Sequence, residues 1–100
     1  MLQTGGIPLT PELQGNYPNP FNGETIIRYA LSSETRVKAS VYNVRGQRIS
    51  QLLDEVQSAG YKSLNWDATD IAGNELSSGI YFLHLNIGEQ KFVRKMVLQK

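Results

Sequence analysis

The chain has 100 residues and a formal net charge of +1, so its overall charge gives no reason to expect binding to nucleic acid or to an anionic membrane. It contains no cysteine, which excludes disulfides, thiolate metal sites and a cysteine nucleophile. Its length suits one domain with one core, and no apolar run approaches the roughly 20 residues of a membrane-spanning helix. We therefore expect a single domain that does not insert directly into a membrane.

The N-terminal residues 1–12 are rich in glycine and proline and poor in apolar side chains, which predicts a linker or flexible arm. They have neither the basic start nor the apolar centre of a signal peptide. If the parent protein is exported, we expect its signal to lie outside this chain. The folded domain is expected over residues 13–100.

The stretch NYPNPFNGET (16–25) suits neither a helix nor a regular strand. Its two prolines fix φ and remove two backbone donors, and each favours extended geometry in the residue before it. Its asparagines are expected to bond nearby backbone in turns, and its two aromatic side chains to fix the segment to the domain. The segment is therefore predicted to be a stiff cover ahead of the first strand, protecting a sheet edge. The residues concerned are Tyr17, Pro18, Asn19, Pro20, Phe21 and Asn22.

The rest of the chain consists of short runs rich in β-branched and aromatic residues, separated by turn signals. No window keeps a helical period for more than two turns, and the polar stretch 54–60 is expected to be a loop. Short strands at roughly 8–12-residue spacing predict an all-β, antiparallel β-sandwich of about seven strands. The expected strands are 25–31, 36–44, 48–53, 61–66, 80–87 and 91–99, with a seventh near 13–17.

No group of residues indicates catalysis. The single histidine, His84, alternates with leucines in a predicted strand, faces solvent and has no evident catalytic partner. Four oxygen-bearing side chains lie within residues 67–75, which raises the possibility of a calcium site. Their spacing does not match an EF-hand loop, and Asp and Asn also stabilise turns, which we favour here. We expect no catalytic residue, no metal and no cofactor.

Aromatic and basic residues suggest where contacts form. Trp66 ends a predicted strand and is expected in the core, whereas Tyr42 and Phe82 lie opposite the main apolar rows of their strands. These two are candidates for an exposed patch or an interface. The final strand carries cations at Arg94 and Lys95. They either block strand addition at an edge or allow a partner to recognise that strand through its charge and free edge.

Several stretches together resemble the C-terminal sorting domains of type IX secretion substrates (type A class). They are LQGNYPNPFNGETIIRYAL, VYNVRGQRI, AGYKSLNWDATDIAGNELSSGIYFLHL and VRKMVLQK, and they cover residues 13–100. The fold is also similar to the immunoglobulin-like domain of the flagellar hook-capping protein, so the resemblance implies an immunoglobulin-like sandwich. It also implies recognition motifs at Pro18, Asn19, Pro20, Phe21, Gly79, Tyr81, Arg94, Lys95 and Lys100.

The resemblance implies a non-catalytic signal that directs an attached N-terminal cargo domain through the outer membrane. The expected partners are the outer-membrane type IX translocon and a sortase-like peptidase that cuts upstream of the domain. The cargo then passes through the periplasm to the cell surface or the medium. The chain departs from the usual family pattern at Gly15, where glutamine is common, and at Gly23, where proline is common.

Two other functions remain open from the sequence. The domain is alternatively an accessory sandwich of a secreted enzyme, binding polysaccharide through Tyr42 and Phe82 or docking to a neighbouring domain. A third possibility is an assembly domain like the hook cap, which oligomerises, whereas the sorting function predicts a monomer.

Overall fold

The computed structural model describes residues 6–100, and residues 1–5 of the predicted linker lie outside the described residues. Seven strands follow one another along the chain. The described part contains no helix that could cross a membrane. The strands are β1 (Glu12–Tyr17), β2 (Thr25–Leu31), β3 (Thr35–Tyr42), β4 (Arg48–Gln57), β5 (Gly60–Trp66), β6 (Gly79–Ile87) and β7 (Gln90–Leu98).

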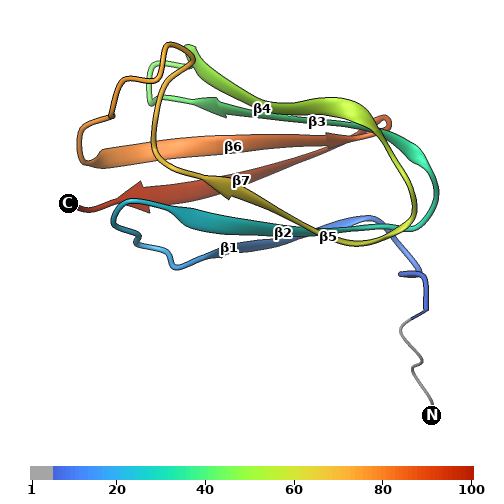
Figure 1. Cartoon of the computed structure of the whole chain (residues 1–100). Helices are drawn as coiled ribbons and strands as arrows, with labels where there is room; N and C mark the ends of the chain where they lie inside the picture. The colour runs from blue at the N-terminus through green and yellow to red at the C-terminus, as the bar shows by residue number, and fades with distance from the viewer. Residues whose placement is uncertain (1–5) are drawn as a thin grey trace.

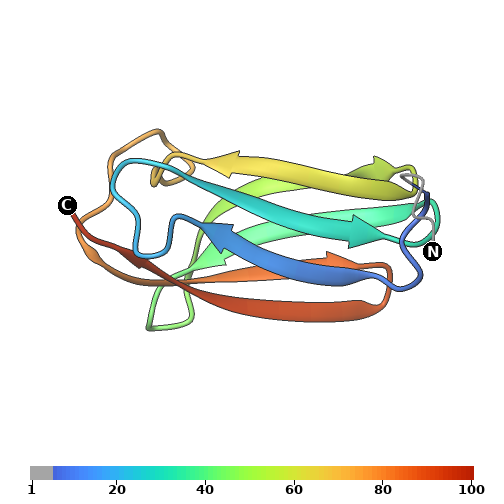
Figure 2. The ribbon, with the colours of Figure 1, turned by 90° about the horizontal axis from the view of Figure 1, so that it is seen from below.

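The strands form two sheets packed face to face, which confirms the predicted β-sandwich (Figure 1). One sheet has the order β1-β2-β5 and the other β4-β3-β6-β7. Every pair of neighbouring strands is antiparallel. Figure 2 shows β7, an edge strand, beside β1 along one side of the sandwich, and residues of the two strands are in contact.

The core lies between the sheets and follows from the period-two alternation of the strands. In β3 the side chains of Val37, Ala39 and Val41 are fully buried, as the sequence predicts, and their neighbours point outward. Trp66 is only 2% exposed, which confirms its predicted core position. The sheets meet through side chains that include Ile27, Tyr29, Leu31, Leu83, Leu85, Met96 and Leu98.

The prediction that residues 54–60 form a loop is wrong for its first half, because β4 continues to Gln57. The extension pairs with the start of β3, where Arg36 Nε lies 2.9 Å from Asp54 Oδ1. At its end, the buried Tyr29 donates its hydroxyl to Gln57 Oε1 at 2.6 Å. Pairing with a neighbouring strand and these two polar contacts override the low β propensity of the acidic stretch.

The β3–β4 hairpin confirms the turn predicted at Gly46, which has a φ of 83° and donates its N–H to Asn43 O. A glycine suits this left-handed backbone conformation. The strand β3 stops at Tyr42, two residues earlier than predicted, because Asn43 enters the turn. The Asn43 side chain accepts from the N–H groups of Arg45 and Gln47, which fixes the turn locally.

Candidate functional site

The segment Pro18–Phe21 lies along the outer edge of β7, and we call this arrangement the Pro-Asn-Pro clasp. Asn19 Nδ2 donates to Lys95 O at 3.1 Å, and Val97 N donates to Asn19 Oδ1 at 3.0 Å. Phe21 N donates to Val97 O at 2.9 Å, and Gln99 N donates to Phe21 O at 2.8 Å. The clasp therefore satisfies the outward backbone groups of β7 from Lys95 to Gln99, which supports the predicted role as an edge cover.

Two buried polar residues hold the clasp to the other sheet. Thr25, which is fully buried, donates its hydroxyl to Pro18 O at 2.8 Å and accepts from Asn16 Nδ2 at 3.0 Å. Asn16 is 6% exposed, and its Oδ1 accepts from Arg94 Nε at 3.0 Å. Asn16 and Thr25 link β1, β2 and β7 through one network. Sequence reasoning missed both, because a polar residue at a loop boundary gives no sign that it is buried.

Two of the motif residues meet at Trp66 in the core. The ring of Phe21 lies 5.7 Å from that of Trp66, and the ring of Tyr81 lies 5.8 Å from Trp66 in an edge-on arrangement. Tyr81 also donates its hydroxyl to Ser77 O at 2.7 Å, and Trp66 Nε1 donates to Thr69 O at 3.2 Å. These contacts fix the connection 67–78 between β5 and β6. Tyr81 therefore supports the end of the sandwich that carries the clasp.

Two expectations for the proline segment are wrong. Tyr17 does not fix the segment to the domain, because its side chain is 76% exposed, whereas Phe21 is 2% exposed and does. Asn19 does not bond nearby backbone but reaches residues of β7 that lie 76 and 78 positions further along the chain. The edge of the terminal strand is consequently not free between Lys95 and Gln99, so another strand can add there only by displacing the clasp.

The C-terminal end of the chain is held against the β5–β6 connection. Lys100 N donates to Ser78 Oγ at 3.0 Å, and Lys100 Nζ lies 3.5 Å from Glu75 Oε1. Lys95 is different, because its side chain is exposed on the outer face of the four-stranded sheet. The basic motif residues thus point in different directions and do not form one cluster.

The oxygen-bearing side chains of residues 67–75 are engaged in turn contacts. Asp70 Oδ1 accepts from Ala72 N and Asn74 N at 3.0 and 2.9 Å. Its hydrogen bond with the Asn74 backbone, followed by those with the Asn74 side chain and other backbone groups, lowers the pKa of this exposed carboxyl. Asp67 accepts from the Thr69 hydroxyl at 2.6 Å. Within residues 6–100, no three carboxylate or histidine side chains gather where they could hold a metal ion.

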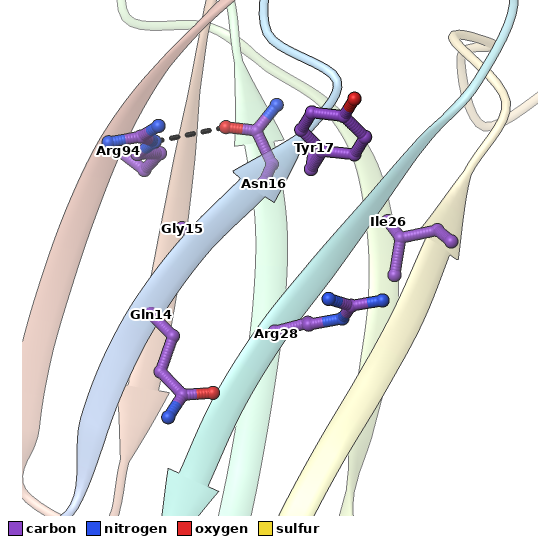
Figure 3. Close-up of a pocket in the computed structure, with 7 residues that line it drawn as sticks. All are labelled: Gln14, Gly15, Asn16, Tyr17, Ile26, Arg28 and Arg94. Atoms are coloured by element: carbon purple, nitrogen blue, oxygen red, sulfur yellow. Dashed lines mark hydrogen bonds between the residues drawn. The ribbon is translucent and has the colours of Figure 1, made fainter.

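A shallow pocket of about 300 Å³ opens beside the clasp (Figure 3). Arg94 and Arg28 both line it, but Figure 3 shows Arg94 on one side of β1 and Arg28 on the other. Gly15 sits at a register shift in β1 with a φ of 117°, and a Cβ there would lie 3.5 Å from the Arg94 guanidinium. That distance is an ordinary van der Waals contact, so it is the positive φ at the backbone bulge that favours glycine here.

The two aromatic residues predicted to be exposed are half-buried on the outer face of the four-stranded sheet. Tyr42 packs against His84 with ring centroids 4.1 Å apart, and Phe82 lies directly across from Tyr42 in the register. Burial, followed by the nearby positive charge of Lys91, lowers the pKa of His84. This histidine is thus a packed aromatic neighbour of Tyr42.

These features define a small immunoglobulin-like β-sandwich whose terminal strand is closed by a proline-rich segment. The chain belongs to the secretion system C-terminal sorting domain family, which it matches over residues 16–99. The matched range includes the clasp, the aromatic cluster around Trp66 and all of β7. No curated protein sequence matches the chain.

Solved structures show the same fold. The chain is similar to part of dimeric latent PorU from Porphyromonas gingivalis, with a TM-score of 0.70 and 17% identity over 88% of this chain. It is similar to part of PorZ, a surface component of the type IX secretion system of the same organism, with a TM-score of 0.59 and 15% identity over 85%. It is also similar to FlgD from P. aeruginosa, with a TM-score of 0.58 and 19% identity over 79%. The chain spans 9% of PorU, 11% of PorZ and 68% of FlgD.

Proposed function

We propose that residues 13–100 form a non-catalytic sorting domain that directs an attached cargo through the outer membrane by the type IX system. The observation that carries this proposal is the clasp, which joins the family's proline motif to its basic terminal strand. Two separated motifs thereby become parts of one folded end of the sandwich. A receptor that binds this end recognises the folded domain as a whole.

The motif residues divide by exposure into two roles. Phe21 and Tyr81 are buried, and Asn19 bonds the backbone of β7, so these three maintain the fold. Pro18, Pro20, Lys95 and Lys100 are exposed at or beside the clasp and are available to the translocon. Gly79 opens β6 directly after the β5–β6 connection, and Arg94 joins β7 to β1 through Asn16.

The same proposal places the peptidase cut within or near the linker 1–12, upstream of β1. The cargo crosses the periplasm with the domain attached and reaches the cell surface or the medium after cleavage. The domain acts as a monomer and uses no cofactor. The exposed residues Ile7 and Leu9, which lie ahead of β1, support cleavage in this segment, because proteolysis concentrates at exposed chain ends and loop tips.

The test is a reporter protein fused ahead of residues 1–100 in a host with an active type IX system. We expect the reporter outside the cell, and its retention in the periplasm while the host's own substrates are exported would contradict the proposal. Deleting Val97–Lys100 removes a clasp partner and a core residue, so export should stop.

A second variant separates recognition from folding. Lys95→Ala with Lys100→Ala changes only side chains that are exposed, and Asn22→Ala with Asn65→Ala serves as its exposed control. The lysine variant should be exported less efficiently than the control while both remain folded. Equal export of the two variants would show that the translocon does not recognise these lysines.

A further inference from the structure

The outer face of the four-stranded sheet carries an ordered array of side chains. Residues paired directly across an antiparallel ladder point to the same face, so the register defines rows that cross the strands. One row has a cation at each end and two aromatic rings between them. That row is Arg48–Tyr42–Phe82–Lys95, and the next two are Gln51–Ser40–His84–Val93 and Asp54–Lys38–Asn86–Lys91.

This surface, which we call the cationic face, holds half of the ten lysine and arginine residues of the chain. Among the described residues it carries five cations, Arg36, Lys38, Arg48, Lys91 and Lys95, and one carboxylate, Asp54. Asp54 is paired with Arg36, and within residues 6–100 the other four cations form no ion pair. The formal charge of the whole chain is only +1, so charge is strongly segregated to this side.

The middle of the cationic face contains a cluster of aromatic side chains. Tyr42, Phe82 and His84 are half-buried, and Val93 is 55% exposed. An aromatic centre with a charged rim is the arrangement found in protein–protein interfaces. Sugar binding needs open aromatic ring faces, and here Tyr42 and His84 cover one face of each other. This packing favours a protein partner over the polysaccharide considered from the sequence.

We propose that the cationic face binds a protein surface with an apolar centre and an acidic rim, presented by the outer-membrane translocon. This inference rests on the proposed sorting function. A second copy of this chain is a poor partner, because a symmetric contact would bring the same cations together. Strand spacing and rise give the array a footprint of about 15 by 20 Å. That is smaller than a stable interface of about 800 Å² per partner, and it suits a transient contact from which the domain is later released.

The test compares two double charge reversals with the same change in net charge. Lys38→Glu with Lys91→Glu changes exposed side chains of the cationic face that lie outside the basic motif. Arg28→Glu with Arg45→Glu changes exposed side chains elsewhere and is the matched control. Each protein is tested for binding to the purified type IX translocon by biolayer interferometry at low and high salt, and as a reporter fusion for export. Emission from the buried Trp66 verifies that every variant is folded.

We expect the face variant to bind the translocon at low salt at least about tenfold more weakly than wild type, and the control within about twofold. Wild-type binding should weaken with rising salt more steeply than binding of the face variant. Equal binding of wild type and face variant would overturn the inference, as would an equal loss in the control. The inference also fails if heparin or phosphatidylglycerol vesicles bind wild type as tightly as the translocon does, and bind the face variant more weakly by the same factor. If the wild-type fusion is not exported, the proposed sorting function itself is wrong. If the wild-type and face-variant fusions are both exported and bind the translocon equally, only the proposed binding surface is wrong.

Discussion

Replacing Asn19 by alanine tests whether the clasp stabilises the domain. The substitution removes both side-chain hydrogen bonds to β7, of 3.1 Å to Lys95 O and 3.0 Å from Val97 N. It leaves the backbone bonds of Phe21 to β7 in place, so the segment stays attached. The effect therefore reports on the Asn19 side chain alone.

The expected loss follows from these two contacts. A hydrogen bond contributes about 0.5–1.5 kcal/mol net, and a donor left without a partner costs more when water cannot reach it. The Lys95 carbonyl contact is exposed and can be replaced by water, whereas the Val97 N–H contact is partly buried. We expect Asn19→Ala to lower the free energy of unfolding by about 1–2 kcal/mol. For a domain of this size the midpoint of thermal unfolding should fall by about 4–8 °C for each kcal/mol.

The assay is urea unfolding followed through Trp66, the only tryptophan, which is 2% exposed in the folded state. Asn22→Ala is the matched control, because Asn22 is an exposed asparagine of the same segment and its side chain makes no hydrogen bond within residues 6–100. Amide exchange at Val97 should accelerate about tenfold in Asn19→Ala and stay unchanged in the control. A loss below about 0.5 kcal/mol, or an equal loss in Asn22→Ala, would refute the reasoning.

Three further predictions follow from the core and from the outer face. Phe21→Ala should cost about 3–5 kcal/mol in urea unfolding, because a buried aromatic ring is replaced by a cavity; a loss under 1 kcal/mol would contradict its core role. Tyr81→Phe should cost about 1 kcal/mol, because it deletes only the bond to Ser77 O, and hydrogen exchange should show the loss concentrated in the connection 67–78. The pKa of His84 is lowered by burial and by Lys91, so the folded state favours the neutral ring. Stability should be full above the ordinary value of 6.5 and fall as the pH drops below it, and His84→Gln should flatten this dependence below pH 6.5. A wild-type urea midpoint that rises on acidification would contradict the expected loss of stability at low pH.

The strands were predictable where alternation alone determines burial. The bounds of β2 agree with the prediction at both ends, because an apolar run is followed directly by turn residues. The end of β4 was not predictable, because its last residues are polar and are held by Arg36 and Tyr29, which lie far away in the sequence. Local patterns contain no information on such partners.

The candidate site shows the same division. The prolines predicted a rigid edge cover, but nothing near Asn19 indicated that its amide would bond to β7. Tyr17 and Phe21 looked equivalent in the sequence, and only the position of the segment against β7 decides which ring is buried. The resemblance to a known family identified the motifs, whereas their structural roles came from the contacts.

The clasp can close only in a polypeptide that is intact from Asn19 to β7. Asn19 and its partners on β7 are separated by more than seventy residues, so these bonds can form only in a chain that extends through β7. A chain truncated by premature termination or by a protease within β7 loses the partners of both Asn19 and Phe21. A receptor that requires the closed clasp would therefore admit only cargo whose signal has been synthesised through its last strand.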